Sequence, residues 1–331
     1  MIERWRRHGT YLGILLLMLA STGSVNADAT AAGPRPVRIG ALTDSWGPTP
    51  HVVGLRDGLV EMGYKENADF VVGVRFTQGD PEALPAAARE LVQAGARLIF
   101  ASNGRAAKAA QAATSGVPIV FAGGGDPIRL GLVQTFARPG GRVTGVTDLD
   151  LELGPKRLEV FRAIVPTLKR VLFVYNADDG YAAEEARLYR DAARHLGLVL
   201  SEKPVKTQEE ARAALLAIPA GAVDGILQPR FLSLNIPGFA LDANAQRGIA
   251  AMFSSAFWVE RGALASYGAD YYGTGRQAAR LVDKILKGAK PADIPVETNP
   301  RVELTINLKT ARALKLTIPT EMLYRADRVI E

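Results

Sequence analysis

The 331-residue sequence contains no cysteine. Disulfide bonds, thiolate catalysis and cysteine-ligated metals are therefore excluded, as is a lipid-modified cysteine after an export signal. Histidine is scarce: His8 falls in the N-terminal leader, His51 is interpreted as a structural residue at a helix start, and His195 as a surface residue. Neither histidines nor carboxylates have metal-ligand spacing. We therefore expect no metal and no cofactor.

Motifs that bind phosphate or supply a nucleophile are also missing. The run Gly123-Gly124-Gly125-Asp126 lacks the Lys-Ser/Thr pair of a phosphate loop, and no Gly-x-Ser-x-Gly occurs. An α/β enzyme that acts on a small metabolite remains an alternative only if its catalytic residues form an arrangement that matches no known motif. The net charge of +6 is spread over helical faces without a basic run carrying interleaved aromatics, so nucleic acid is not an expected partner.

The N-terminus, 1–27, has the pattern of a cleavable secretory signal. Three arginines form its positive start, Leu12–Ala20 is a short apolar run, and small residues precede a cleavage site after Ala27. The alternative is an N-terminal membrane anchor. No other stretch approaches ~18 consecutive apolar residues, so the mature chain is not expected to span a membrane. Export of a cysteine-free α/β chain predicts a periplasmic location.

Short apolar runs bounded by turn residues alternate with amphipathic helical stretches through the rest of the chain. Such runs are typical of strands buried on both faces of a parallel sheet. The alternation occurs twice, which predicts an α/β fold of two doubly wound parallel-sheet lobes. Several crossings between the lobes would form a multi-strand hinge. The first lobe is expected to span 37–146 plus about 264–292, and the second about 147–263 plus about 300–331.

Polar and aromatic residues follow the expected strands at their carboxyl ends, the edge at which open α/β sheets bind ligands. Helix N-termini from two lobes that face one cleft would receive a carboxylate. Taken singly, each polar side chain could instead cap the next helix, as Asp126 would before Pro127. Trp46, Tyr181 and Trp258 are apolar walls of the site or ordinary core and rim residues. The candidate ligand-binding residues are Thr43, Asp44, Ser45, Trp46, Ser102, Asn103, Gly123, Gly124, Gly125, Asp126, Asn176, Asp178, Asp179, Tyr181, Gln228, Arg230, Ser254 and Tyr267.

Several longer motifs occur in order along the mature chain. They include Val117-Pro118-Ile119-Val120-Phe121, Asp126-Pro127-Ile128, Ala137-Arg138-Pro139-Gly140-Gly141 and Ile306-Asn307-Leu308-Lys309-Thr310-Ala311. With these motifs the chain resembles the ABC-transporter substrate-binding proteins that include tryptophan- and tyrosine-type receptors. The resemblance implies a type I periplasmic-binding-protein fold that encloses a small molecule between two lobes. It further implies that the ligand is delivered to an ABC permease in a transient contact, and we expect the protein to be a monomer.

One loop departs from the pattern of the amino-acid receptors, which often carry Asn and Ser after the first strand of the second lobe. Here the loop Asn176-Ala177-Asp178-Asp179-Gly180-Tyr181 is acidic and has no serine. The ligand class therefore stays open among an amino acid, another small carboxylate and a cation drawn by Asp178 and Asp179. A periplasmic sensor that reports to a signalling partner is the alternative to transport.

Overall fold

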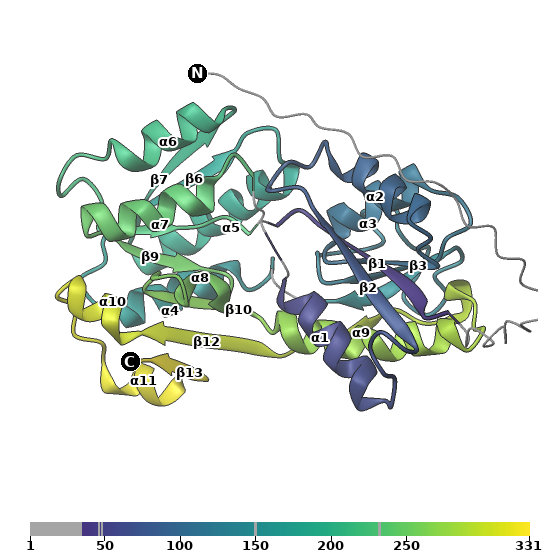
Figure 1. The fold of residues 1–331 in the computed structure, drawn as a ribbon. Coiled ribbons are helices and arrows are strands. Elements are labelled where there is room, and N and C mark those ends of the chain that lie inside the picture. The colour runs from purple at the N-terminus through teal and green to yellow at the C-terminus, as the bar shows by residue number, and fades with distance from the viewer. Residues whose placement is uncertain (1–34, 46, 48, 149–150, 231–232) are drawn as a thin grey trace, which may run out of the picture. The chain divides into compact units, whose positions relative to one another are not determined.

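The computed structural model describes residues 35–45, 47, 49–148, 151–230 and 233–331. The predicted signal (1–27) and Trp46 lie outside these residues. Pro36–Glu331 fold as one unit around two sheets, each with helices on both faces (Figure 1). Within the described ranges, every helix is too short or too polar to traverse a bilayer.

The first lobe is a six-stranded sheet in which every pair of neighbours is parallel. Its elements are β1 (Val37–Thr43), α1 (Pro50–Glu61), β2 (Phe70–Phe76), α2 (Leu84–Gln93), β3 (Leu98–Ala101), α3 (Gly104–Ala113), β4 (Ile119–Ala122), β5 (Val143–Thr147), α9 (Tyr271–Leu286), η1 (Pro291–Asp293) and β11 (Glu297–Thr298). The strand order is β11-β5-β4-β3-β1-β2. Helices α2 and α3 pack on one face and α1 and α9 on the other. Strands β3 and β4 are buried throughout, which explains their uninterrupted apolar sequences.

The second lobe is a seven-stranded sheet in which β10, β9, β8, β6 and β7 are parallel to one another. Strand β12 pairs antiparallel with β10, and β13 pairs parallel with β12. Its elements are α4 (Gly154–Ile164), β6 (Arg170–Asn176), α5 (Gly180–Leu196), β7 (Val199–Val205), α6 (Gln208–Leu216), β8 (Gly225–Leu227), α7 (Ile236–Arg247), β9 (Ala250–Phe253), α8 (Ala256–Val259), β10 (Ala265–Ala269), β12 (Val302–Asn307), α10 (Leu308–Ala313), α11 (Thr320–Arg325) and β13 (Arg328–Ile330). The strand order is β13-β12-β10-β9-β8-β6-β7. Helices α4, α5, α10 and α11 pack on one face, and α6, α7 and α8 on the other.

The expectation that about 264–292 belongs to the first lobe is wrong for its first residues, which form β10 of the second lobe. Strand β10 pairs with β9 and with β12, so it belongs to the second sheet. The chain passes to the first lobe at Asp270, which caps α9, and it returns between β11 and β12. The reason is long-range pairing: β10 is buried between two strands of the second sheet, and its own five residues do not encode that neighbourhood.

Helices α1 and α9 form a close pair because small residues lie where they touch. A Cβ added to Gly54 would lie 2.1 Å from the carbonyl oxygen of Tyr272, and one added to Gly275 would lie 2.0 Å from the carbonyl oxygen of His51. Both approaches need glycine, since no larger residue fits without separating the helices. This packing fixes the first turn of α1, with His51, against the first turn of α9, with Tyr271.

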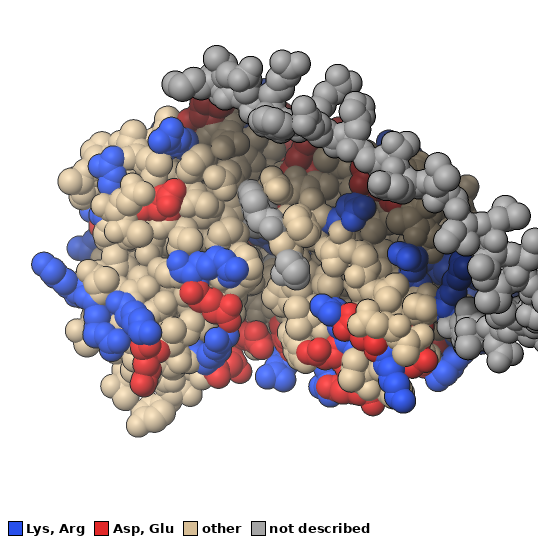
Figure 2. Space-filling model, viewed as in Figure 1, with Lys and Arg blue, Asp and Glu red and all other residues tan. Residues whose placement is uncertain are grey.

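Charged side chains of both signs are mixed on the face shown in Figure 2. Arg276 pairs with Glu61 at 2.6 Å, and Arg280 pairs with Glu297 at 2.9 Å. Both pairs join residues of α1, α9 and β11, so charges of opposite sign lie side by side there. Such a surface differs from the continuous basic patch with which proteins bind a phosphate backbone.

Candidate functional site

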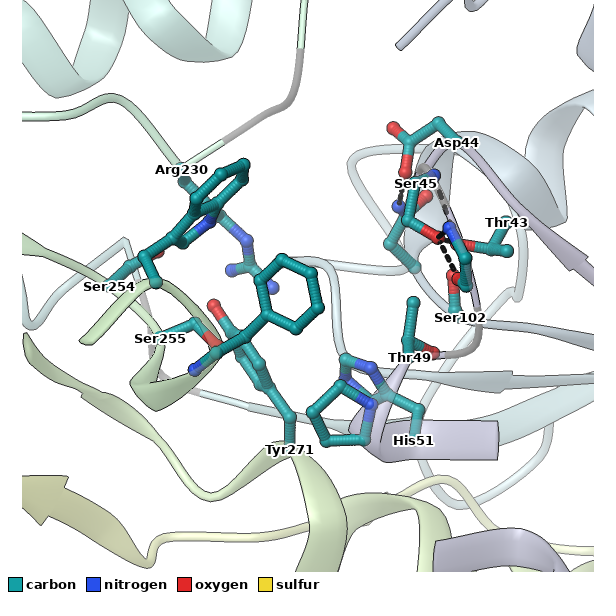
Figure 3. Close-up of a pocket in the computed structure, with 15 residues that line it drawn as sticks. Thr43, Asp44, Ser45, Thr49, His51, Ser102, Arg230, Ser254, Ser255 and Tyr271 are labelled. Carbon is teal, nitrogen blue, oxygen red and sulfur yellow. Dashed lines mark hydrogen bonds between the residues drawn. The ribbon is translucent and has the colours of Figure 1, made fainter. Parts of the chain in front are cut away.

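A pocket lies at the carboxyl ends of strands from both sheets (Figure 3). The first lobe contributes the residues that follow β1 and β3 and the start of α1. The second lobe contributes residues that follow β8 and β9, and Tyr271 comes from the first turn of α9. The residues lining the pocket are Thr43, Asp44, Ser45, Gly47, Thr49, Pro50, His51, Ser102, Asn103, Arg230, Ser254, Ser255, Phe257, Trp258 and Tyr271.

Asp44 is the central charged group on the polar side of the pocket, where Figure 3 shows it grouped with Thr43, Ser45 and Ser102. Its side chain is almost fully buried, with 3% of the residue exposed. One carboxylate oxygen accepts a 2.9 Å hydrogen bond from Nδ2 of Asn103. The other, Oδ2, has no hydrogen-bond partner among the residues that the structure describes. A cationic donor inside the pocket would complete its hydrogen bonding.

Burial raises the pKa of Asp44, because a charged carboxylate loses hydration there. The positive charge of Arg105 and the hydrogen bond from Asn103 oppose this rise. Asn103 is itself fixed, since its Oδ1 caps α3 by accepting a 2.8 Å hydrogen bond from the amide of Ala106. The carboxylate is therefore held rigidly in a position where its charge is costly without a further partner.

Arg230 brings a guanidinium to the pocket from the loop after β8. It donates two hydrogen bonds to Asp148, from Nη1 to Oδ1 at 3.1 Å and from Nη2 to Oδ2 at 3.0 Å. The backbone amide of Arg230 donates to Oε2 of Glu185 at 3.0 Å, which anchors the loop to α5. Arg230 is thus fixed at its backbone by Glu185 and at its side chain by Asp148. A guanidinium fixed in this way can bind a ligand carboxylate in a defined orientation.

The opposite side of the pocket is aromatic. The rings of His51 and Tyr271 stack with centroids 4.7 Å apart and an interplanar angle of 24°. Phe257 meets Trp258 edge to face at 5.1 Å. The pocket thus places Asp44 and the hydroxyl groups of the first lobe opposite a side where Arg230, Ser254 and Ser255 lie with the flat rings (Figure 3). Such a mixture of charged groups and rings suits a small zwitterion that carries an apolar or aromatic side chain.

Known proteins that resemble the chain share this architecture. A model of the ABC transporter substrate binding protein family matches residues 44–330. The chain belongs to this family. The resemblance expected from the sequence motifs is therefore confirmed, and members of the family are substrate-binding receptors rather than enzymes.

Several individual relatives of this substrate-binding protein are similar over most of its length. The tyrosine-binding protein of Clostridioides difficile is 29% identical over 266 residues, which cover 80% of this chain and 76% of that protein. The structure of an ABC domain from Streptococcus pneumoniae in complex with L-Trp is 28% identical, with a TM-score of 0.77 over 89% of this chain and all of that one. A conserved domain protein of Vibrio cholerae is 29% identical, with the same TM-score and coverage. These matches confirm the predicted type I periplasmic-binding-protein fold.

The pocket brings together several residues predicted as ligand-binding from their positions after strands. They are Thr43, Asp44, Ser45, Ser102, Asn103, Arg230 and Ser254. Trp258 also lines the pocket, in agreement with its interpretation as an apolar wall of the site. His51, Phe257 and Tyr271 were missed, and the interpretation of His51 as purely structural overlooked its place in the pocket lining. The usable signal was their position in the first turns of helices that begin at the ligand-binding edge of the sheets.

The predicted triple glycine is not part of the pocket lining, although a Cβ added to Gly123 would lie 3.2 Å from Nε2 of His51, which lines it. A Cβ added to Gly123 would lie 2.5 Å from Oδ2 of Asp148, and one added to Gly125 would lie 3.1 Å from the ring of Tyr181. These glycines therefore let side chains of the interlobe region come close to the backbone of the first lobe. Asp126 is exposed and caps a turn, accepting from the amide of Ile128 at 2.8 Å, so the expected helix after Pro127 is not formed.

The acidic loop after β6 is also occupied by contacts within the protein. Asn176 accepts from the amide of Asp178 at 3.0 Å, and Asp178 is an exposed residue 3.8 Å from Lys206. Asp179 caps α5 and forms an ion pair with Arg105. This pairing explains why the loop is acidic without lining the pocket, and it removes the reason to expect a cation there.

Two further candidates are placed in the second lobe away from the pocket lining. Gln228 is buried and its Nε2 donates to the carbonyl oxygen of Pro229. Tyr267 packs against the core of the second lobe, and its carbonyl oxygen accepts a 2.6 Å hydrogen bond from Nε of Arg157. Over the described part of the chain, no group of three or more histidine, aspartate or glutamate side chains is arranged to hold a metal ion.

Ion pairs connect the two lobes around the pocket. Arg105 of α3 pairs with Asp179 at the start of α5, and Arg129 lies 2.5 Å from Glu184. Together with the pair between Arg230 and Asp148, these contacts cross from one sheet's elements to the other's. They describe a closed arrangement in which charges from each lobe neutralise one another.

Proposed function

We propose that this substrate-binding protein captures an aromatic amino acid between its lobes in the periplasm and delivers it to an ABC permease. The observation that carries the proposal is the buried Asp44, whose Oδ2 lacks a partner among the described residues while Arg230 and a wall of aromatic rings face the same pocket. The predicted export signal and the family membership support the location and the permease partner.

The chemistry of an α-amino acid fits each part of the pocket. Its ammonium group would donate to Asp44 and neutralise this carboxylate, whose Oδ2 has no hydrogen-bond partner among the described residues. Its carboxylate would lie toward Arg230 and the hydroxyls of Ser254 and Ser255, and its ring toward Phe257 and Tyr271. A plain carboxylic acid has no cation for Asp44, and neither has a neutral sugar.

Relatives support the same class of ligand. The Clostridioides difficile relative is named a tyrosine-binding protein, and the Streptococcus pneumoniae structure holds L-Trp. Closure would follow from differential affinity, because the ligand contacts Asp44 of one lobe and Arg230 of the other only when the lobes meet. The closed form would then be the state that the permease recognises.

Ligand-induced stabilisation tests the proposal directly. L-tyrosine or L-tryptophan at about 100 times its dissociation constant is expected to raise the free energy of unfolding by about 2.7 kcal/mol, because it binds the folded state alone. Differential scanning fluorimetry and isothermal titration calorimetry measure this effect. Tyramine and 3-indolepropionic acid, which lack the carboxylate and the ammonium respectively, serve as controls and should bind far more weakly. The proposal fails if no proteinogenic amino acid shifts the melting temperature.

Replacement of Arg105 by glutamine is expected to weaken amino-acid binding roughly tenfold. Closure in this variant would bury Asp179 without its cationic partner, whereas the open form would leave that carboxylate hydrated. Titration calorimetry at fixed ionic strength gives the affinity, and small-angle scattering gives the closed fraction. Arg190→Gln is the matched control, because Arg190 pairs with Glu202 inside the second lobe. An equal loss in both variants would contradict a role for Arg105 in closure.

A further inference from the structure

His51 is a buried pocket residue whose position is fixed from two sides. It lies in the first turn of α1 with 6% of its surface exposed, and its ring stacks on Tyr271. Its carbonyl oxygen lies so close to Gly275 of α9 that a Cβ there would approach to 2.0 Å. Figure 3 shows the imidazole beside Tyr271, apart from the group formed by Thr43, Asp44 and Ser102. The imidazole therefore belongs to the aromatic side of the pocket.

Both nitrogens of this ring are buried, and neither has a hydrogen-bond partner in the described ranges 35–45, 47, 49–148, 151–230 and 233–331. Burial of an unsatisfied donor and acceptor is unfavourable, and a phenylalanine would stack on Tyr271 without that cost. The hydrogen-bond donor and acceptor of His51 are therefore not used by its stacking on Tyr271.

The protonation state of His51 determines which ligand groups its imidazole can bind by hydrogen bonds. Burial lowers the pKa of His51 to about 4, with the charge of Asp148 opposing the shift and that of Arg230 adding to it. At neutral pH the imidazole is uncharged and offers one N–H donor and one lone pair. Its natural complement is a neutral polar group that donates a hydrogen, accepts one, or does both.

We infer that His51 sets ring specificity by hydrogen bonding to a polar group on the ligand's aromatic ring, so that phenol- or indole-bearing amino acids are preferred to phenylalanine. The inference rests on the proposed function, because it assumes that the ligand is an aromatic amino acid whose ring occupies the aromatic side of the pocket. A phenolic hydroxyl can bond either nitrogen of a neutral imidazole, by accepting from the N–H or by donating to the lone pair, and an indole N–H can donate to the lone pair. Phenylalanine would leave both nitrogens unsatisfied, which is how a site built for a hydroxyl or N–H rejects an analogue without one.

The test compares L-tyrosine, L-tryptophan and L-phenylalanine by titration calorimetry on the wild type and on His51→Phe. The wild type is expected to bind tyrosine or tryptophan at least tenfold more tightly than phenylalanine. His51→Phe should reduce this ratio to about threefold or less, through weaker binding of the polar-ring ligand. His51→Gln, which restores a donor and an acceptor, should recover part of the preference, and the exposed His195→Phe should leave it unchanged.

Three outcomes would overturn the inference, and they are distinguishable. Equal weakening of all three ligands in His51→Phe would assign His51 a structural role, and an unchanged preference would place the ring group elsewhere. Failure of the wild type to bind any of the three would overturn the proposed function and this inference with it. Circular dichroism of each variant identifies a loss of fold, in which case His51→Gln alone decides between the first two outcomes.

Discussion

Asparagine at position 44 is expected to weaken binding of a zwitterionic amino acid by roughly 30- to 4,000-fold, the effect of removing one partner from a buried charge pair. Asp44→Asn keeps the shape of the side chain and an oxygen that can accept from Asn103, but it removes the negative charge opposite the ligand's ammonium. The same change is expected to raise the free energy of unfolding of the ligand-free protein by about 1–3 kcal/mol, because a buried and incompletely paired carboxylate is eliminated.

The pH dependence of this gain in stability follows from the raised pKa of Asp44 in the folded state. The pKa of Asp44 is 3.8 in the unfolded chain and higher in the folded protein. At a pH between these two values the folded protein binds more protons than the unfolded chain does. The free energy of unfolding of the wild type therefore falls as pH rises through this window. The stability difference between Asp44→Asn and wild type should therefore be complete above the folded pKa and vanish below about 3.8. Arg105, Arg230 and Asn103 face the carboxylate and limit how far the window extends.

Urea denaturation at several pH values and titration calorimetry with L-tyrosine and L-tryptophan measure the two effects. Asp178→Asn is the matched control, because Asp178 is exposed outside the pocket and should change neither quantity appreciably. Affinity retained within threefold in Asp44→Asn would show that the ammonium lies elsewhere. Weaker binding together with a higher free energy of unfolding would show that Asp44 favours ligand binding and lowers the stability of the ligand-free protein.

The polar side of the pocket could be predicted because its residues directly follow buried strands. Asp44 and Arg230 come one and three residues after β1 and β8, and parallel strands bring their carboxyl ends to one edge. The aromatic side could not be predicted in this way. His51 and Tyr271 are far apart in sequence, and only the glycine-mediated packing of α1 on α9 brings their rings together.

Local chemistry also misled where a long-range partner decides the role of a residue. The acidity of Asp178 and Asp179 suggested a cationic ligand, but Arg105 and Lys206 are their partners and lie elsewhere in the sequence. Strand β10 is similar, since its pairing with β9 and β12 determines its lobe. In each case the missing information was a contact between segments whose proximity depends on the completed fold.

Methionine in place of Arg157 is expected to lower the free energy of unfolding by about 3–5 kcal/mol. The guanidinium is completely buried and donates to Oε1 of Glu185 at 3.2 Å, to the hydroxyl of Tyr189 at 2.8 Å and to the carbonyl oxygen of Tyr267 at 2.6 Å. Its loss would leave a buried glutamate without its cation. Urea denaturation provides the measurement, and Arg190→Met, which removes an exposed ion pair on α5, should cost less than about 1 kcal/mol.

A double variant separates the charge from the packing of this buried network. Glu185→Gln added to Arg157→Met should recover a large part of the lost stability, because the uncompensated charge is removed while an amide oxygen can still accept from the backbone of Arg230. Since that backbone bond anchors the loop carrying Arg230, the double variant should also bind amino acids more tightly than Arg157→Met does. If Arg157→Met alone is as stable as wild type, or if Glu185→Gln destabilises it further, the ion pair does not hold this part of the second lobe. Recovery of stability and affinity together would instead connect the buried arginine to the pocket through Glu185.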